Sequence, residues 1–133
     1  AIVGPVEGGE QFRNIDRHLV KQVNQVLVLR IDESLFFGNL RYLDNRINGL
    51  LASHPAMEHL VLVASGINHI DSSALQSLLE LNTRLDDKGI KMHFSDVKGP
   101  VLDRLHRINF ADELTGTVYL SQHQAWQDLT QLY

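Results

Sequence analysis

Residues 60–75, LVLVASGINHIDSSAL, decide how this chain folds. The run Leu60–Ala64 is apolar without alternation, which is typical of a strand that is covered on both faces. Residues 65–70 have the composition of a turn, and the residues Asp71, Ser72 and Ser73 are of the types that cap the start of a helix. We therefore expect a buried strand whose carboxyl end leads through a turn into a helix.

The same order of strand and helix precedes this segment. The apolar run Val26–Ile31 predicts a second buried strand. After it, apolar residues recur every three or four positions from Leu40 to Leu51, which predicts a helix with one buried stripe. Asn39 is the expected N-cap of that helix, and Pro55 follows its end.

The order continues downstream. Ile90–Phe94 alternates strictly between apolar and polar residues, which predicts a strand with one polar face. A helix is expected to begin at Gly99-Pro100, a short strand within residues 117–120, and a last helix after Ser121, which has Gln124 three positions later as in a capping box. Strands that alternate with helices favour an α/β fold with right-handed crossovers and a mostly parallel sheet.

Length and composition exclude several classes of protein. The chain has 133 residues, 44% of them hydrophobic and 21% charged, which fits one globular domain and excludes disorder along the whole chain. It has no cysteine, so disulfide scaffolds and thiolate metal sites are excluded. A net charge of −4 argues against a protein that binds nucleic acid by neutralising phosphates. The apolar runs are far shorter than the ~20 residues of a membrane span.

The segment Asp71-Ser72-Ser73-Ala74 is the strongest candidate for a functional site. It lies where a strand ends and a helix begins, which is where open α/β sheets place binding sites. Free N–H groups and the helix dipole favour an anion there, and a phosphoryl group on Ser72 would add roughly −1.5 to −2 charges beside Asp71. The alternative is that Asp71 or Ser72 serves only as an N-cap.

No pattern of a catalytic, metal or nucleotide site accompanies this segment. His69 and Ser72 are close in sequence, but the nucleophile-elbow pattern of a hydrolase is missing, so serine catalysis is only a minor hypothesis. The seven histidines lack the spacing of metal ligands, and the glycines form no phosphate-binding loop. We expect no catalytic residues, no metal and no cofactor.

Two further surfaces are candidates for contacts with a partner. The cluster Phe36-Phe37-Gly38-Asn39 follows a strand, and it either packs in the core or forms an interaction surface. The helix expected to begin at Gly99-Pro100 carries Arg104, His106 and Arg107, with Lys98 directly before it. These basic residues form either a solvated face or a contact surface for an acidic partner or lipid headgroups.

Four segments together resemble the STAS domain (sulfate transporter and anti-sigma-factor antagonist) at the C-terminus of SulP-family anion permeases. Phe12–His18 resembles the link from the last membrane helix, and Val28–Asn39 resembles the opening of the domain. Val63–Leu75 resembles the family's central signature, and Lys98–Val101 resembles the start of its third helix.

The resemblance implies a STAS fold, with a four- to five-stranded, mostly parallel sheet and about four helices mainly on one face. It also implies that residues 1–15 are a linker from a transmembrane region and that residues 16–133 are the STAS domain. The implied function is that of a non-catalytic regulatory and interaction domain of a transporter of sulfate, bicarbonate or a dicarboxylate, on the cytoplasmic side of the bacterial inner membrane.

The partners that the resemblance implies are the membrane part of the same transporter and a soluble cytosolic protein. The full-length protein is expected to be a homodimer, whereas the isolated domain can be a monomer. Asp71–Ala74 and Phe36–Asn39 are the expected contact surfaces. The alternative is a free-standing anti-sigma-factor antagonist that is switched by phosphorylation of Ser72.

Overall fold

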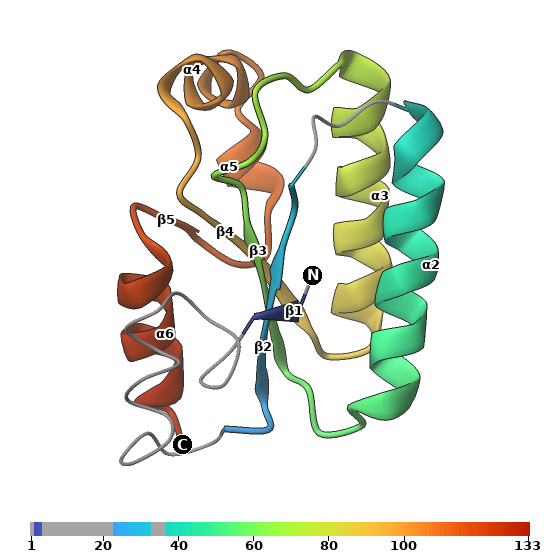
Figure 1. The fold of residues 1–133 in the computed structure, drawn as a ribbon, viewed down its shortest axis with the longest axis vertical. Coiled ribbons are helices and arrows are strands. Elements are labelled where there is room, and N and C mark those ends of the chain that lie inside the picture. The colour runs from blue at the N-terminus through green and yellow to red at the C-terminus, as the bar shows by residue number, and fades with distance from the viewer. Residues whose placement is uncertain (1, 4–22, 33–36) are drawn as a thin grey trace.

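The computed structural model describes residues 2–3, 23–32 and 37–133, and Figure 1 shows its fold. Over these residues one sheet has five strands in the order β1-β2-β3-β4-β5. The strands are β1 (Ile2–Val3), β2 (Val26–Arg30), β3 (His59–Val63), β4 (Lys91–Ser95) and β5 (Val118–Tyr119). The helices are α2 (Phe37–Ser53), α3 (Ser72–Asp87), α4 (Gly99–Arg107), α5 (Phe110–Glu113) and α6 (Gln122–Thr130).

The sheet is mostly parallel, as the sequence predicts. Strands β2 to β5 run parallel to one another, with Leu60 of β3 opposite Leu27 on one side and Met92 on the other. Only β1 is antiparallel, and it pairs Ile2 with Leu29. The described strands lie in the sheet in the same order as in the chain, so the strand order does not change direction at any point among them.

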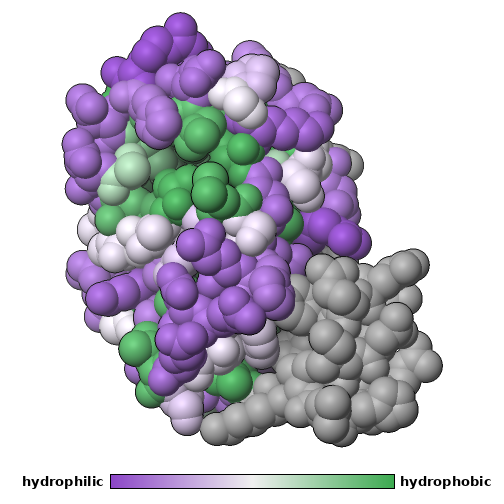
Figure 2. Space-filling model, turned by 90° about the vertical axis from the view of Figure 1, so that its left-hand side faces the viewer, coloured by the Kyte–Doolittle hydropathy of each residue, from purple (hydrophilic) through white to green (hydrophobic). Residues whose placement is uncertain are grey.

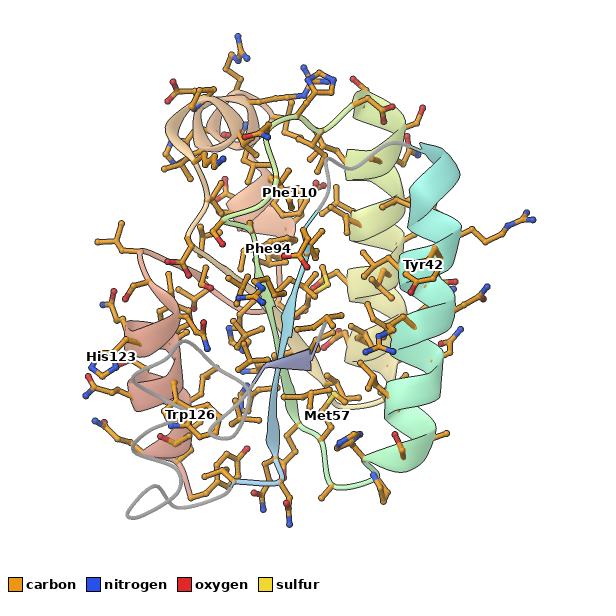
Figure 3. All side chains as sticks on the ribbon, in the orientation of Figure 1. Tyr42, Met57, Phe94, Phe110, His123 and Trp126 are labelled. Carbon is orange, nitrogen blue, oxygen red and sulfur yellow. The ribbon has the colours of Figure 1, made fainter. Side chains whose placement is uncertain are left out.

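The helices α2, α3, α4 and α5 all pack on one face of the sheet, and α6 packs on the other (Figure 1). The larger core lies on the four-helix face and contains Leu60, Leu62, Met92 and Phe94. Phe94 meets Phe110 of α5 edge to face at 5.6 Å between ring centroids (Figure 3). The expected fold class, with its helices mainly on one face, is therefore confirmed.

The second core explains why β2 and β3 are apolar without alternation. On the α6 face, Val28 and Val61 join a cluster with Ala125, Trp126 and Leu129. These two strands therefore bury side chains on both faces, and all five residues of β3 are buried. Because neither face of these strands is open to water, polar residues are not needed at every second position.

One expectation about β4 is wrong. The alternation in Ile90–Phe94 predicts a polar, exposed face, yet His93 is 3% exposed and Ser95 is fully buried. Of the residues of β4, only Lys91 is exposed. The physical reason is that the chain after β4 returns over this face, and the ring of Tyr119 in β5 lies 5.8 Å from that of His93.

The predicted ends of the helices are confirmed, with one exception. Helix α4 begins at Gly99 with Pro100 in its first turn, and Ser121 Oγ accepts a hydrogen bond from the Gln124 N–H at the start of α6. Asn39 is not the N-cap of α2, because that helix already begins at Phe37. None of the helices formed by the described residues is both long and apolar enough to cross a membrane.

Candidate functional site

The candidate site lies at the carboxyl edge of the parallel strands, at the top of Figure 1. Here α3 begins at Ser72 after the turn that follows β3, and α4 begins at Gly99 after β4. Helix α2 begins at the same edge, since it follows β2. The fold therefore brings residues 71–74 and the described part of the second segment, residues 37–39, to one end of the molecule.

Asp71 is the N-cap of α3, as the capping hypothesis predicts. Its Oδ1 accepts a hydrogen bond from the Ala74 N–H at 2.7 Å, which satisfies one of the free donors of the first helical turn. Ala74 is fully buried in the larger core. The part of this segment that presents surface is therefore Asp71-Ser72-Ser73, with Ser72 and Ser73 exposed.

Ser72 is held by a residue that is distant in the sequence. Nη2 of Arg104, on α4, donates a hydrogen bond to Ser72 Oγ at 2.7 Å. Nε of Arg104 is buried, and the described residues offer it no hydrogen-bond partner. The guanidinium group therefore retains a donor that Ser72 does not use, beside a hydroxyl group that faces solvent.

A second contact ties the start of α4 to the turn before α3. Lys98 Nζ donates a hydrogen bond to Asn68 Oδ1 at 2.6 Å. Two basic side chains thus contact the start of α3: Lys98 binds the loop before this helix, and Arg104 binds its first turn. His106 and Arg107 are exposed.

The aromatic candidates are described only in part. Phe37, Gly38 and Asn39 are the first residues of α2, and the structure describes only their backbone. Phe36 lies outside the described residues. The interaction surface expected at Phe36–Asn39 thus stays a prediction, and only the backbone of residues 37–39 is placed, at the edge of the sheet where α3 also begins.

The site is a surface with a shallow groove beside it. Because the described strand order has no reversal, the sheet lacks the diverging crossovers that open a ligand crevice in doubly wound folds. A groove of about 460 Å³ runs from Ser72 along α3 toward Ile108, with Leu79 among its apolar residues and Glu80 and Glu113 among its charged ones. Among the described residues, no group of three or more histidine and carboxylate side chains could hold a metal ion.

Sequence reasoning missed the pairing of Arg104 with Ser72. The sequence identified both residues, but it assigned Arg104 to a basic helix face and Ser72 to an anion-binding helix start. They are 32 positions apart, so no local pattern joins them. One signal could have predicted this contact. Because β3 and β4 are parallel, the helices that follow them begin at the same edge of the sheet, so a basic residue of α4 can reach the start of α3.

This chain belongs to the STAS domain family. The family model matches residues 18–125, which are most of the chain. The predicted family membership is therefore confirmed.

Two known proteins illustrate the relationship within sulfate transporters. The chain is 28% identical over 122 residues to Sulfate transporter 1.3 of Arabidopsis thaliana, an alignment that covers 84% of this chain and 19% of that protein. The fold is similar to that of the STAS domain of a SulP transporter from Vibrio cholerae, with a TM-score of 0.73, 18% identity, and coverage of 94% of this chain and 98% of that one.

The fold is also similar to that of an anti-sigma-factor antagonist. The structure of the antagonist SpoIIAA in its unphosphorylated form matches with a TM-score of 0.58 and 12% identity, over 84% of this chain and 94% of that one. At this identity the likeness shows the fold alone. The chain spans about a fifth of the length of the curated sulfate transporters that it matches.

Proposed function

We propose that this chain is the non-catalytic regulatory and interaction domain of a SulP-type anion transporter, attached on the cytoplasmic side of the bacterial inner membrane. The observation that carries the proposal is the alignment of 84% of the chain with about a fifth of each of two sulfate transporters. Residues 1–15 would then link the domain to the membrane part, and Ile2–Val3 of that segment adds β1 to the sheet.

The contact surface in this proposal is Asp71-Ser72-Ser73, together with the start of α2. Ser72 is exposed and is held in place by Arg104, so the surface is ordered before a partner arrives. A second area, on the side of the molecule turned away from α2, also gathers apolar side chains on its upper half (Figure 2). Exposed apolar areas of this kind mark protein contacts, and the membrane part of the same transporter is the proposed partner.

The gene that encodes this chain tests the attachment directly. Sequencing upstream of the codon for Ala1 should reveal a continuous reading frame with several apolar segments of about 20 residues, each long enough to span a membrane. A start codon immediately before Ala1 would contradict the transporter and favour the free-standing antagonist.

Ser72→Glu in the full-length transporter tests the contact surface. The new carboxylate would lie beside Asp71 and within reach of Arg104, so it should change the charge of the surface and leave the fold intact. We expect anion uptake into reconstituted vesicles to change by about five-fold or more, as for a typical coupling between two sites.

The matched control is Gln127→Glu, which adds the same charge at an exposed position of α6. Uptake by this variant should equal that of the wild type. If Ser72→Glu leaves uptake unchanged while far-UV circular dichroism shows a folded domain, the surface at Asp71–Ser73 is not the regulatory contact.

A further inference from the structure

Two histidines lie side by side inside the molecule, on the face of the sheet that α6 covers. His59 begins β3 and His93 is the central residue of β4, and they are 7% and 3% exposed. His59 Nδ1 lies 3.0 Å from His93 Nε2, and the ring centroids are 5.2 Å apart. Two ring nitrogens at this distance share a hydrogen bond, so one nitrogen must donate and the other must accept.

The backbone assigns those roles. The N–H of Thr117, just before β5, donates a hydrogen bond to His93 Nδ1 at 3.0 Å. His93 Nδ1 therefore carries no proton, and a neutral His93 carries its proton on Nε2 and donates it to His59 Nδ1. His59 in turn carries its proton on Nε2. An added proton on His59 Nδ1 or His93 Nδ1 would set two donors against each other.

The pair joins the sheet to the C-terminal segment, which we define as residues 116–133. Besides the Thr117 N–H bond, the Thr117 carbonyl accepts a hydrogen bond from the Phe94 N–H at 3.0 Å. Gly116 packs so closely that a Cβ atom there would lie 2.5 Å from His93 Nδ1. The ring of Tyr133, at the end of the segment, lies 6.1 Å from that of His59.

We propose that the His59–His93 pair is a pH-sensitive switch: the neutral pair holds the C-terminal segment on the sheet, and a proton added to the pair releases that segment while the four-helix face stays folded. The cluster under α6 is separate from the larger core, so α6 can leave without opening that core, although Val118 of β5 packs against the larger core and would lose this contact. The inference concerns this chain alone and holds whether or not it belongs to a transporter.

The titratable and charged groups around the pair come from each element packed on it. They are Glu58 before β3, Lys91 of β4, Tyr119 of β5 and Tyr133, and Asp128 of α6 acts on Tyr119. Tyr133 Oη donates a hydrogen bond to Glu58 Oε1 at 3.0 Å. Glu58 favours a charged His59, whereas Lys91 opposes it.

Burial decides the direction in which pH acts. Burial lowers the pKa of His93 to about 4, with smaller contributions of the same sign from His59 and Lys91. Burial also lowers the pKa of His59. A released His93 regains a pKa near 6.5, so the released state binds more protons as the pH falls from about 6.5 to about 4. Docking of the segment is therefore complete above this window and weakens within it.

Trp126 reports the position of α6, because it is the one tryptophan of the chain and lies buried on that helix (Figure 3). We expect its fluorescence emission to shift to the red at a midpoint between about pH 6.5 and about pH 4, while far-UV circular dichroism still shows the other helices. His93→Asn keeps an acceptor for Thr117 N–H and cannot be protonated. It should move the midpoint down by about one pH unit or more.

His106→Asn is the control, since His106 is exposed on α4, and its midpoint should equal that of the wild type. The switch is excluded if His93→Asn has the wild-type midpoint, or if the wild type loses the circular dichroism signal of all its helices together with the fluorescence change. Nuclear magnetic resonance on the wild type decides the case in which His93→Asn does not fold. Protonation of His93 should coincide with the loss of contacts between Trp126 and the cluster of the second core, which includes Val61, and protonation with those contacts intact would overturn the proposal.

Discussion

Phe110→Ala should lower the free energy of unfolding by about 3–5 kcal/mol. Phe110 is fully buried at the start of α5, and its ring packs on Phe94. Truncation should leave a cavity between β4 and α5. The backbone of these two elements cannot easily move together to fill it. A domain with a typical stability of about 5–15 kcal/mol would lose a large part of it. Urea denaturation followed by far-UV circular dichroism measures the change.

Ile108→Ala is the control for this prediction. Ile108 precedes Phe110 by two positions and is 45% exposed, so its truncation should change the free energy of unfolding by only about 0.5 kcal/mol. A Phe110→Ala variant as stable as Ile108→Ala would mean that α5 does not seal the larger core.

Gly116→Ala should destabilise the protein by about 3 kcal/mol. A Cβ atom at Gly116 would lie 2.2 Å from the Met92 carbonyl oxygen and 2.5 Å from His93 Nδ1. The carbonyl belongs to a central strand and cannot move without breaking the sheet, so residues 115–117 would have to lift away from β4. That movement also removes the hydrogen bond from Thr117 N–H to His93. Thermal and urea denaturation measure the loss.

Gly49→Ala makes the same chemical change where space is free. Gly49 lies within α2, and apart from its chain neighbours and the nearby backbone of its own helix, no described heavy atom lies within 4 Å of the position that its Cβ would take. Alanine favours a helix over glycine by about 0.5–1 kcal/mol, so this variant should be slightly more stable than the wild type. If both alanine variants change stability in the same direction, the close approach at Gly116 is not the cause of the loss.

The strands and helices were predictable because each leaves a local pattern. The apolar run of residues 60–64 and the cap at Asp71 are interactions among neighbours in the chain, and the structure confirms both. The burial of His93 was not predictable from the alternation of β4, because histidine counts as polar in such a pattern. It is buried because His59 and Thr117 satisfy both its ring nitrogens.

Sequence by itself determined the parallel α/β architecture, the family resemblance and the helix start at Asp71-Ser72-Ser73. It did so because hydrophobic periodicity and helix caps act over a few residues. Only the tertiary structure decided that Arg104 holds Ser72 and that His59 meets His93, since these contacts join residues 32 and 34 positions apart. Such contacts depend on the order of strands in the sheet and on the return of the chain over its second face, which no local pattern records.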